Sequence, residues 1–188
     1  MYQDAMYQVK RASQSHTLPI RGLAYHIRTW GTPKPDVPPL VMVHGWMDIG
    51  ASFQFMVDAL ADDRWVIAPD LRGFGGTQPA FADSFWFADY LADLDAILQS
   101  LVGDQPIDLL GHSLGGHIAT TYAGVRPNRI RRLVNLEGFG LASTRPSQAP
   151  GRYAQWLDEI AAFNAGEKDL KTYESLTAVA NRLTKTNP

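Results

Sequence analysis

Residues 109–119, LLGHSLGGHIA, decide the fold of this chain of 188 residues. An apolar run ends at a serine, and small or apolar residues follow. Gly111, Ser113 and Gly115 fit the pattern G-x-S-x-G, in which a tight strand-to-helix turn exposes a serine hydroxyl. An ordinary glycine-rich turn can carry the same pattern, but here a predicted strand precedes it and a predicted helix follows. We therefore expect Ser113 to be a nucleophile, or to descend from one.

Apolar strand patterns alternate with helical patterns on both sides of this turn. Continuous apolar runs predict buried strands, and apolar residues spaced i, i+3, i+4, i+7 predict helices. Such alternation is typical of an α/β fold with a mostly parallel sheet, right-handed crossovers and flanking helices. A half-buried strand is predicted at residues 23–30, buried strands at residues 40–44 and 64–69, and further strands at residues 106–111 and 130–136. Helices are predicted at residues 52–62, 83–102 and 114–127.

The chain divides into three parts by composition. Residues 1–15 are polar and show no pattern, which predicts a flexible N-terminal tail. Residues 16–140 carry the alternating strands and helices. Residues 141–188 begin with a connection rich in proline, serine and glycine and continue as two amphipathic helices without a further strand. We expect this last part to be the start of a helical cap or lid.

Composition argues against several classes of function. The net charge of −2 gives the molecule no general attraction to nucleic acid or anionic lipid. The chain has no cysteine, which excludes disulfides, thiolate metal sites and a cysteine nucleophile. No segment resembles a signal peptide or approaches the roughly 18 apolar residues of a membrane span. The sequence thus predicts a cytoplasmic protein without a membrane span or a nucleic-acid partner, and it leaves the oligomeric state open.

Two further loops complete a recognisable set of motifs. HGW at residues 44–46 and DLRGFG at residues 70–75 each come at the end of a predicted strand. With G-x-S-x-G, in this order and spacing, they resemble the α/β-hydrolase superfamily from about residue 22 to residue 138. HGWMD at residues 44–48 and RLTKTNP at residues 182–188 are most similar to its serine hydrolase-like branch. A serine at position 113 indicates an esterase-like member, because dehalogenases and epoxide hydrolases of this superfamily have aspartate there.

The resemblance implies an oxyanion hole beside the nucleophile. Its donors would be the backbone N–H of Leu114, at a helix N-terminus, and that of Trp46. Two such donors stabilise the negative charge of a tetrahedral intermediate. The Trp46 indole either walls the acyl pocket or is a core aromatic.

Other polar residues of these motifs are expected to support loops. The resemblance implies that His44 and His112 brace the loops rather than act as bases. Asp70 and Arg72 are expected to form a loop-stabilising ion pair.

The general base is not found in these residues. In this superfamily the serine, the acid and the histidine follow one another along the chain. After Ser113 comes only His117, carried on the same helix about 6 Å along its axis, so it cannot reach across the nucleophile. We therefore expect the catalytic histidine to be missing and the chain to be an N-terminal portion that stops within the cap. Glu137, after the strand at residues 130–136, is a candidate for the acid of the triad. Alternatively, Glu137 caps a loop or lines the site, and the acid lies beyond residue 188.

The leading hypothesis is a serine hydrolase that cleaves an ester-like acyl bond through an acyl-enzyme, without a metal or cofactor. Tyr153 and Trp156 at the start of the predicted cap suggest a small hydrophobic acyl or aromatic substrate. A carbon–carbon bond hydrolase or an acyltransferase on the same scaffold is the alternative enzyme. A non-catalytic small-molecule-binding module is the alternative of another class.

Overall fold

The computed structural model describes residues 7–77, 85–140, 143–167 and 172–186. The chain forms two compact units, residues 1–140 and residues 141–188. In the described residues, the first unit contains all the strands and the second contains helices only. That the second unit begins a cap stays a prediction.

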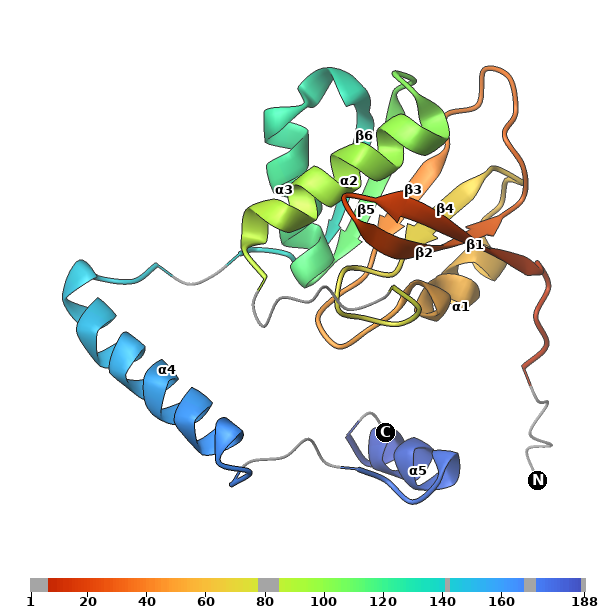
Figure 1. Cartoon of the computed structure of the whole chain (residues 1–188). Helices are drawn as coiled ribbons and strands as arrows, with labels where there is room; N and C mark the ends of the chain where they lie inside the picture. Colours follow the sequence, from red (N-terminus) through yellow and green to blue (C-terminus); the bar gives the residue numbers. More distant parts are fainter. Residues whose placement is uncertain (1–6, 78–84, 141–142, 168–171, 187–188) are drawn as a thin grey trace. The chain divides into compact units, whose positions relative to one another are not determined.

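Six strands form a single sheet in the order β1-β2-β4-β3-β5-β6 (Figure 1). β2 pairs antiparallel with β1 and with β4, whereas β3 pairs parallel with β4 and β5, and β5 parallel with β6. The predicted mostly parallel sheet is therefore confirmed. The strands are β1 (Ser13–Ile20), β2 (Leu23–Trp30), β3 (Leu40–Val43), β4 (Val66–Pro69), β5 (Ile107–His112) and β6 (Ile130–Leu136).

Helices cover both faces of the sheet (Figure 1). The helices of the first unit are α1 (Gln54–Ala59), α2 (Phe87–Val102) and α3 (Leu114–Val125). One hydrophobic cluster joins the sheet to α2 and α3 and includes Ile27, Val41, Ile67, Leu94, Leu98, Leu109 and Ile118. A second joins the other face to α1 and includes Trp30, Met42, Phe53, Val57, Val66 and Leu110. β3 and β4 are apolar throughout because both strands are buried on both faces of the sheet.

The expected N-terminal tail is shorter than the sequence pattern indicated. Residues 13–15 belong to β1, and the Asp58 carboxylate of α1 accepts the backbone N–H groups of Lys10 and Arg11 at 3.0 and 2.9 Å. The prediction of a tail over residues 1–15 is therefore wrong for residues 10–15, and residues 1–6 lie outside the described residues. β1 is an edge strand with mostly exposed side chains, so it lacks the apolar alternation that reveals a strand.

The second unit contains α4 (Ala149–Asn164) and α5 (Leu176–Thr186), the two helices that the sequence predicts there. No residue of α4 is buried, and its apolar side chains, among them Tyr153, Trp156 and Leu157, are exposed. Across the described parts of both units, no helix combines the length and the apolar character needed to cross a bilayer.

Candidate active site

Ser113 lies in the turn between β5 and α3. Its backbone has φ 52° and ψ −116°, a conformation that residues other than glycine rarely adopt. Its N–H donates to the carbonyl of Leu136 at 2.8 Å, which ties the turn to the end of β6. The side chain is exposed at the carboxyl edge of the parallel strands. This edge is where open α/β sheets bind their ligands.

Glycines allow the elbow to form. A Cβ on Gly111 would lie 2.1 Å from the carbonyl oxygen of Gly115, and one on Gly115 would lie 2.1 Å from that of Val43. Both obstacles are backbone atoms, which cannot move aside as a flexible side chain can. β5, α3 and β3 therefore approach one another at a distance that only glycine permits.

The loop after β3 lies beside the nucleophile. A Cβ on Gly45 would be 3.2 Å from the Cβ of Ser113. Trp46 follows directly, and its indole, 62% exposed, meets the Phe74 ring edge-on at 5.2 Å between centroids. The structure thus brings the predicted Trp46 loop to Ser113 and Leu114, the first residue of α3. Sequence reasoning missed Phe74 as the support of Trp46, although Phe74 lies inside the DLRGFG motif.

The loop after β4 is organised by the Asp70 carboxylate, which is buried. It accepts the N–H of Gly50 at 2.7 Å and the N–H of Gly76 at 2.8 Å, and it lies 2.8 Å from His26 Nδ1. Because Gly50 ends the loop after β3, Asp70 joins the β3 and β4 loops. Its side-chain partner in the described residues is His26, and no lysine or arginine there pairs with it.

Arg72 points away from Asp70 and toward α2, so the predicted Asp70–Arg72 ion pair is wrong. Its Nε and Nη2 donate to the two carboxylate oxygens of buried Asp93 at 2.6 and 2.8 Å. This pairing raises the pKa of the Arg72 guanidinium. The Tyr25 hydroxyl also donates to Asp93, at 3.2 Å, and burial raises the pKa of that phenol. Asp70 and Arg72 therefore both stabilise the loop, but Asp70 does so through His26 and Arg72 through Asp93 rather than through each other.

His44 is fully buried and has a partner at each ring nitrogen. Nε2 accepts the N–H of Leu71 at 2.8 Å, and Nδ1 lies 2.7 Å from the carbonyl of Gly45. These two bonds require the neutral ring with its proton on Nδ1. Burial lowers the pKa of His44, which favours the same neutral form. His44 therefore holds the β3 and β4 loops together.

Two of the other histidines lie on the antiparallel side of the sheet. His16 of β1 is bonded to the Thr29 hydroxyl at 3.0 Å, and His26 of β2 is bonded to Asp70. β1 and β2 are separated from β5 by β4 and β3. Neither ring is placed beside the nucleophile.

The last two histidines flank Ser113 along the chain. His112 Nδ1 faces the Gly45 backbone, where an added Cβ would approach it to 3.1 Å. The His117 ring packs on Phe87 at 4.5 Å between centroids. No hydrogen bond joins either ring to the Ser113 hydroxyl among the described residues.

Glu137 follows β6 directly. Its backbone has φ 60°, and its side chain is exposed. Within the described residues its carboxylate makes no hydrogen bond or ion pair. The side chain is thus free to take up a partner at the edge that carries Ser113.

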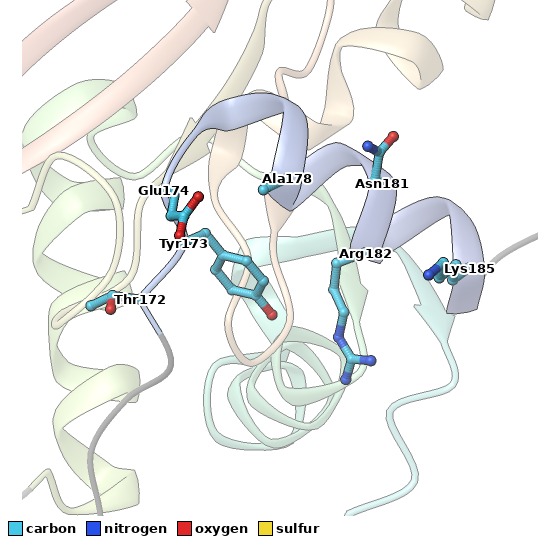
Figure 2. Close-up of a pocket in the computed structure, with 7 residues that line it drawn as sticks. All are labelled: Thr172, Tyr173, Glu174, Ala178, Asn181, Arg182 and Lys185. Atoms are coloured by element: carbon cyan, nitrogen blue, oxygen red, sulfur yellow. The ribbon is translucent and has the colours of Figure 1, made fainter.

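A separate hollow of about 440 Å³ lies within the second unit. In Figure 2 the Tyr173 ring and the Arg182 side chain extend from the ribbon in the same direction. None of the predicted site residues lines it. Its lining residues are Thr172, Tyr173, Glu174, Ala178, Asn181, Arg182 and Lys185. In the described ranges, no group of three or more histidine and acidic side chains is arranged to hold a metal ion.

Comparison with known proteins gives consistent matches. A family model described as alpha/beta hydrolase fold matches residues 38–183, more than half of the chain. A serine hydrolase-like protein of Danio rerio is 26% identical over 96% of this chain and 55% of its own length. The human (lyso)-N-acylphosphatidylethanolamine lipase is 34% identical over 68% of this chain and 38% of its own length.

A solved thioesterase domain from the curacin biosynthetic pathway superposes with a TM-score of 0.78 at 28% identity. The match covers 94% of this chain and 63% of that domain. The chain thus spans between 38% and 63% of the lengths of these three proteins.

Proposed function

The chain belongs to the alpha/beta hydrolase fold family, and on that premise we propose that it carries the nucleophile of a serine hydrolase acting on an ester-like acyl bond. Ser113 attacks the carbonyl carbon, the leaving group departs, and water then cleaves the acyl-enzyme. One observation carries the proposal: Ser113 is exposed, with positive φ, in the strand-to-helix turn at the carboxyl edge of β5.

Two backbone donors serve as the oxyanion hole in this proposal. The N–H of Leu114 begins α3 and so lies among the first helical N–H groups, which have no intrahelical acceptor. The N–H of Trp46 belongs to the loop that Gly45 brings against Ser113. Removing one such donor typically costs about 10²–10³ in kcat.

The proposed general base is a histidine outside these residues, oriented by Glu137. All five histidines of the chain lie in described residues, and His16, His26 and His44 already have ring partners. Glu137 supports the proposal because its exposed carboxylate follows β6, the neighbour of β5. A carboxylate in that place can hold an imidazole in the tautomer that accepts the serine proton.

The proposed substrate has a hydrophobic acyl or aromatic group, and the reaction uses no metal or cofactor. Trp46 and Met47, which follow Gly45, are 62% and 78% exposed, and Phe139, two residues after Glu137, is 89% exposed. Exposed apolar side chains gathered around a polar centre are typical of ligand sites. Relatives named as a lipase and a thioesterase are consistent with such a substrate.

Labelling with a fluorophosphonate tests the proposal. In the native gene product that contains these residues, we expect the reagent to modify Ser113 and Ser113→Ala to abolish labelling. Ser100→Ala, which changes an exposed serine of α2, is the matched control and keeps full labelling. Undiminished labelling of Ser113→Ala would overturn the proposal. Ligand binding without any labelling would favour a non-catalytic binding module.

A further inference from the structure

Unfavourable backbone conformations gather around the proposed site. Of the five described non-glycine residues with positive φ, Met47, Ser113 and Glu137 follow β3, β5 and β6. These strands are neighbours in the sheet. Such conformations are unfavourable for residues other than glycine and persist only where the surroundings hold them in place. The structure must therefore contain groups that hold Glu137 at φ 60°.

The side chain of Asn135 encloses the turn that carries Glu137. Its Oδ1 accepts the N–H of Gly138 at 2.7 Å, and its Nδ2 donates to the carbonyl of Gly138 at 2.9 Å. The amide thus bonds both backbone groups of one residue and spans Glu137. A carboxylate could supply only the acceptor, and an apolar side chain could supply neither group.

The same turn is fixed to the helix that carries the nucleophile. Asn135 Nδ2 also donates to the Thr120 hydroxyl of α3 at 2.9 Å. Gly138 packs directly on α3, because an added Cβ would lie 2.3 Å from the Cα of Gly116. With the Ser113 N–H bonded to the Leu136 carbonyl, β6 is anchored to the elbow on both sides of Glu137.

We propose that Asn135 is a positioning residue for the acid: its amide clamp on Gly138 holds the Glu137 backbone so that the carboxylate faces the proposed catalytic histidine. This inference rests on the proposed function, in which Glu137 orients that histidine. Without the clamp, Glu137 relaxes toward negative φ, which redirects its side chain. The Asn135 side chain itself touches neither the substrate nor the reacting atoms.

A double-mutant cycle in the native gene product tests this role. We expect Asn135→Ala to lower kcat by at least about tenfold with KM nearly unchanged. The reason is that the change misplaces the Glu137 carboxylate, which acts in the transition state and not in substrate binding. In a Glu137→Gln background the same change should cost less than about twofold, since no carboxylate remains to be positioned. Additive losses, as expected of a purely structural residue, would overturn the inference.

Two further variants separate the clamp from general stability. Asn135→Asp keeps the acceptor for the Gly138 N–H, so its kcat should lie between those of wild type and Asn135→Ala. If the alanine variant does not fold, the aspartate variant replaces it in the test. Thr120→Val removes only the bond to α3, so kcat should stay within about threefold of wild type. Amide exchange at Gly138 should accelerate in Asn135→Ala and not in Thr120→Val. An equal loss of kcat in Thr120→Val, or unchanged Gly138 exchange in Asn135→Ala, would overturn the clamp.

The outcomes also distinguish this inference from the proposed function. Absent labelling of Ser113 would overturn the proposed function and with it any role for a positioned acid. Normal labelling with little effect of Glu137→Gln would overturn both the acid and its clamp while leaving the nucleophile in place. A large effect of Glu137→Gln beside a silent Asn135→Ala would overturn the clamp alone.

Discussion

At the scale of single residues, His44 and Glu137 differ in how many partners the fold gives their side chains. His44 is buried and bonded at both ring nitrogens, so a catalytic proton transfer would break a bond that joins two loops. Glu137 is exposed and has no side-chain partner in the described residues. A carboxylate that orients a catalytic histidine must be available to accept a hydrogen bond from that histidine. Sequence position alone does not reveal this difference, because each residue directly follows a parallel strand.

Glu137→Gln tests the acid directly. The amide keeps the size of the side chain but removes the charge that stabilises an imidazolium. If Glu137 orients the base, kcat of the native gene product should fall by about 10⁴, as in serine triads that lose this carboxylate. Glu167→Gln, a change at an exposed position of the second unit, should leave kcat unchanged. A fall of less than about tenfold would return Glu137 to a structural role.

His44 should make stability dependent on pH. Burial lowers its pKa in the folded protein, whereas the unfolded chain has the ordinary value of about 6.5. Below about pH 6.5 the His44 side chain therefore takes up a proton in the unfolded state but stays neutral in the folded state. As a result, the free energy of unfolding falls as the pH falls from about 6.5 toward the pKa of His44 in the folded protein. Urea unfolding of wild type and His44→Gln between pH 7 and pH 5 measures this contribution. An identical pH dependence in both proteins would contradict it.

At the scale of elements, the elbow depends on backbone contact between α3 and β3. Gly115→Ala would place a Cβ 2.1 Å from the Val43 carbonyl oxygen, so the helix must shift. We expect the free energy of unfolding to drop by at least about 2 kcal/mol, as in overpacked cores. The matched control is Gly124→Ala in the same helix, where an added Cβ meets nothing within 4 Å. That change should instead stabilise by about 0.5–1 kcal/mol. Equal effects in chemical denaturation would contradict the close packing.

β3 and β4 could be predicted from the sequence because burial on both faces leaves continuous apolar runs. The elbow could be predicted because its glycines and its serine are adjacent in the chain. β1 could not, since its exposed edge position imposes no alternation. The partners of Asp70 and Arg72 were missed because His26 and Asp93 lie on other elements, which only the folded loops bring near. The Asn135 clamp has a weak local signal, an asparagine three residues before a glycine.

At the scale of the whole molecule, the first unit has an exposed strand at one edge of its sheet. β6 has no neighbour beyond β5 in the described residues, and Leu133 and Val134 are 39% and 44% exposed. Unpaired edge strands with apolar side chains favour association between molecules. We expect the purified 188-residue chain to associate as its concentration rises, which sedimentation velocity would show. Val134→Lys should weaken association more than Val125→Lys, a change at an exposed valine at the end of α3. Equal effects would exclude the edge as the contact.

The 188-residue chain by itself should turn over esters very slowly. It carries Ser113 and both proposed oxyanion donors, but in the part of the chain that the structure describes no histidine ring is bonded to the Ser113 hydroxyl. Without a general base the hydroxyl stays protonated near neutral pH, so attack on an ester is slow. Serine hydrolases without a working triad retain about 10³–10⁴ over the rate in water, supplied by the oxyanion hole and binding.

Hydrolysis of p-nitrophenyl acetate and butyrate by the purified chain, beside Ser113→Ala, measures that residual rate. We expect Ser113→Ala to change it little, because the remaining rate does not depend on an activated serine. A kcat within about tenfold of 10 s⁻¹, the approximate median for enzymes, would contradict this expectation if Ser113→Ala abolished the activity. Such a result would place the base within these residues. His112 and His117, which flank Ser113 along the chain, would then be the side chains whose rings must move to reach it.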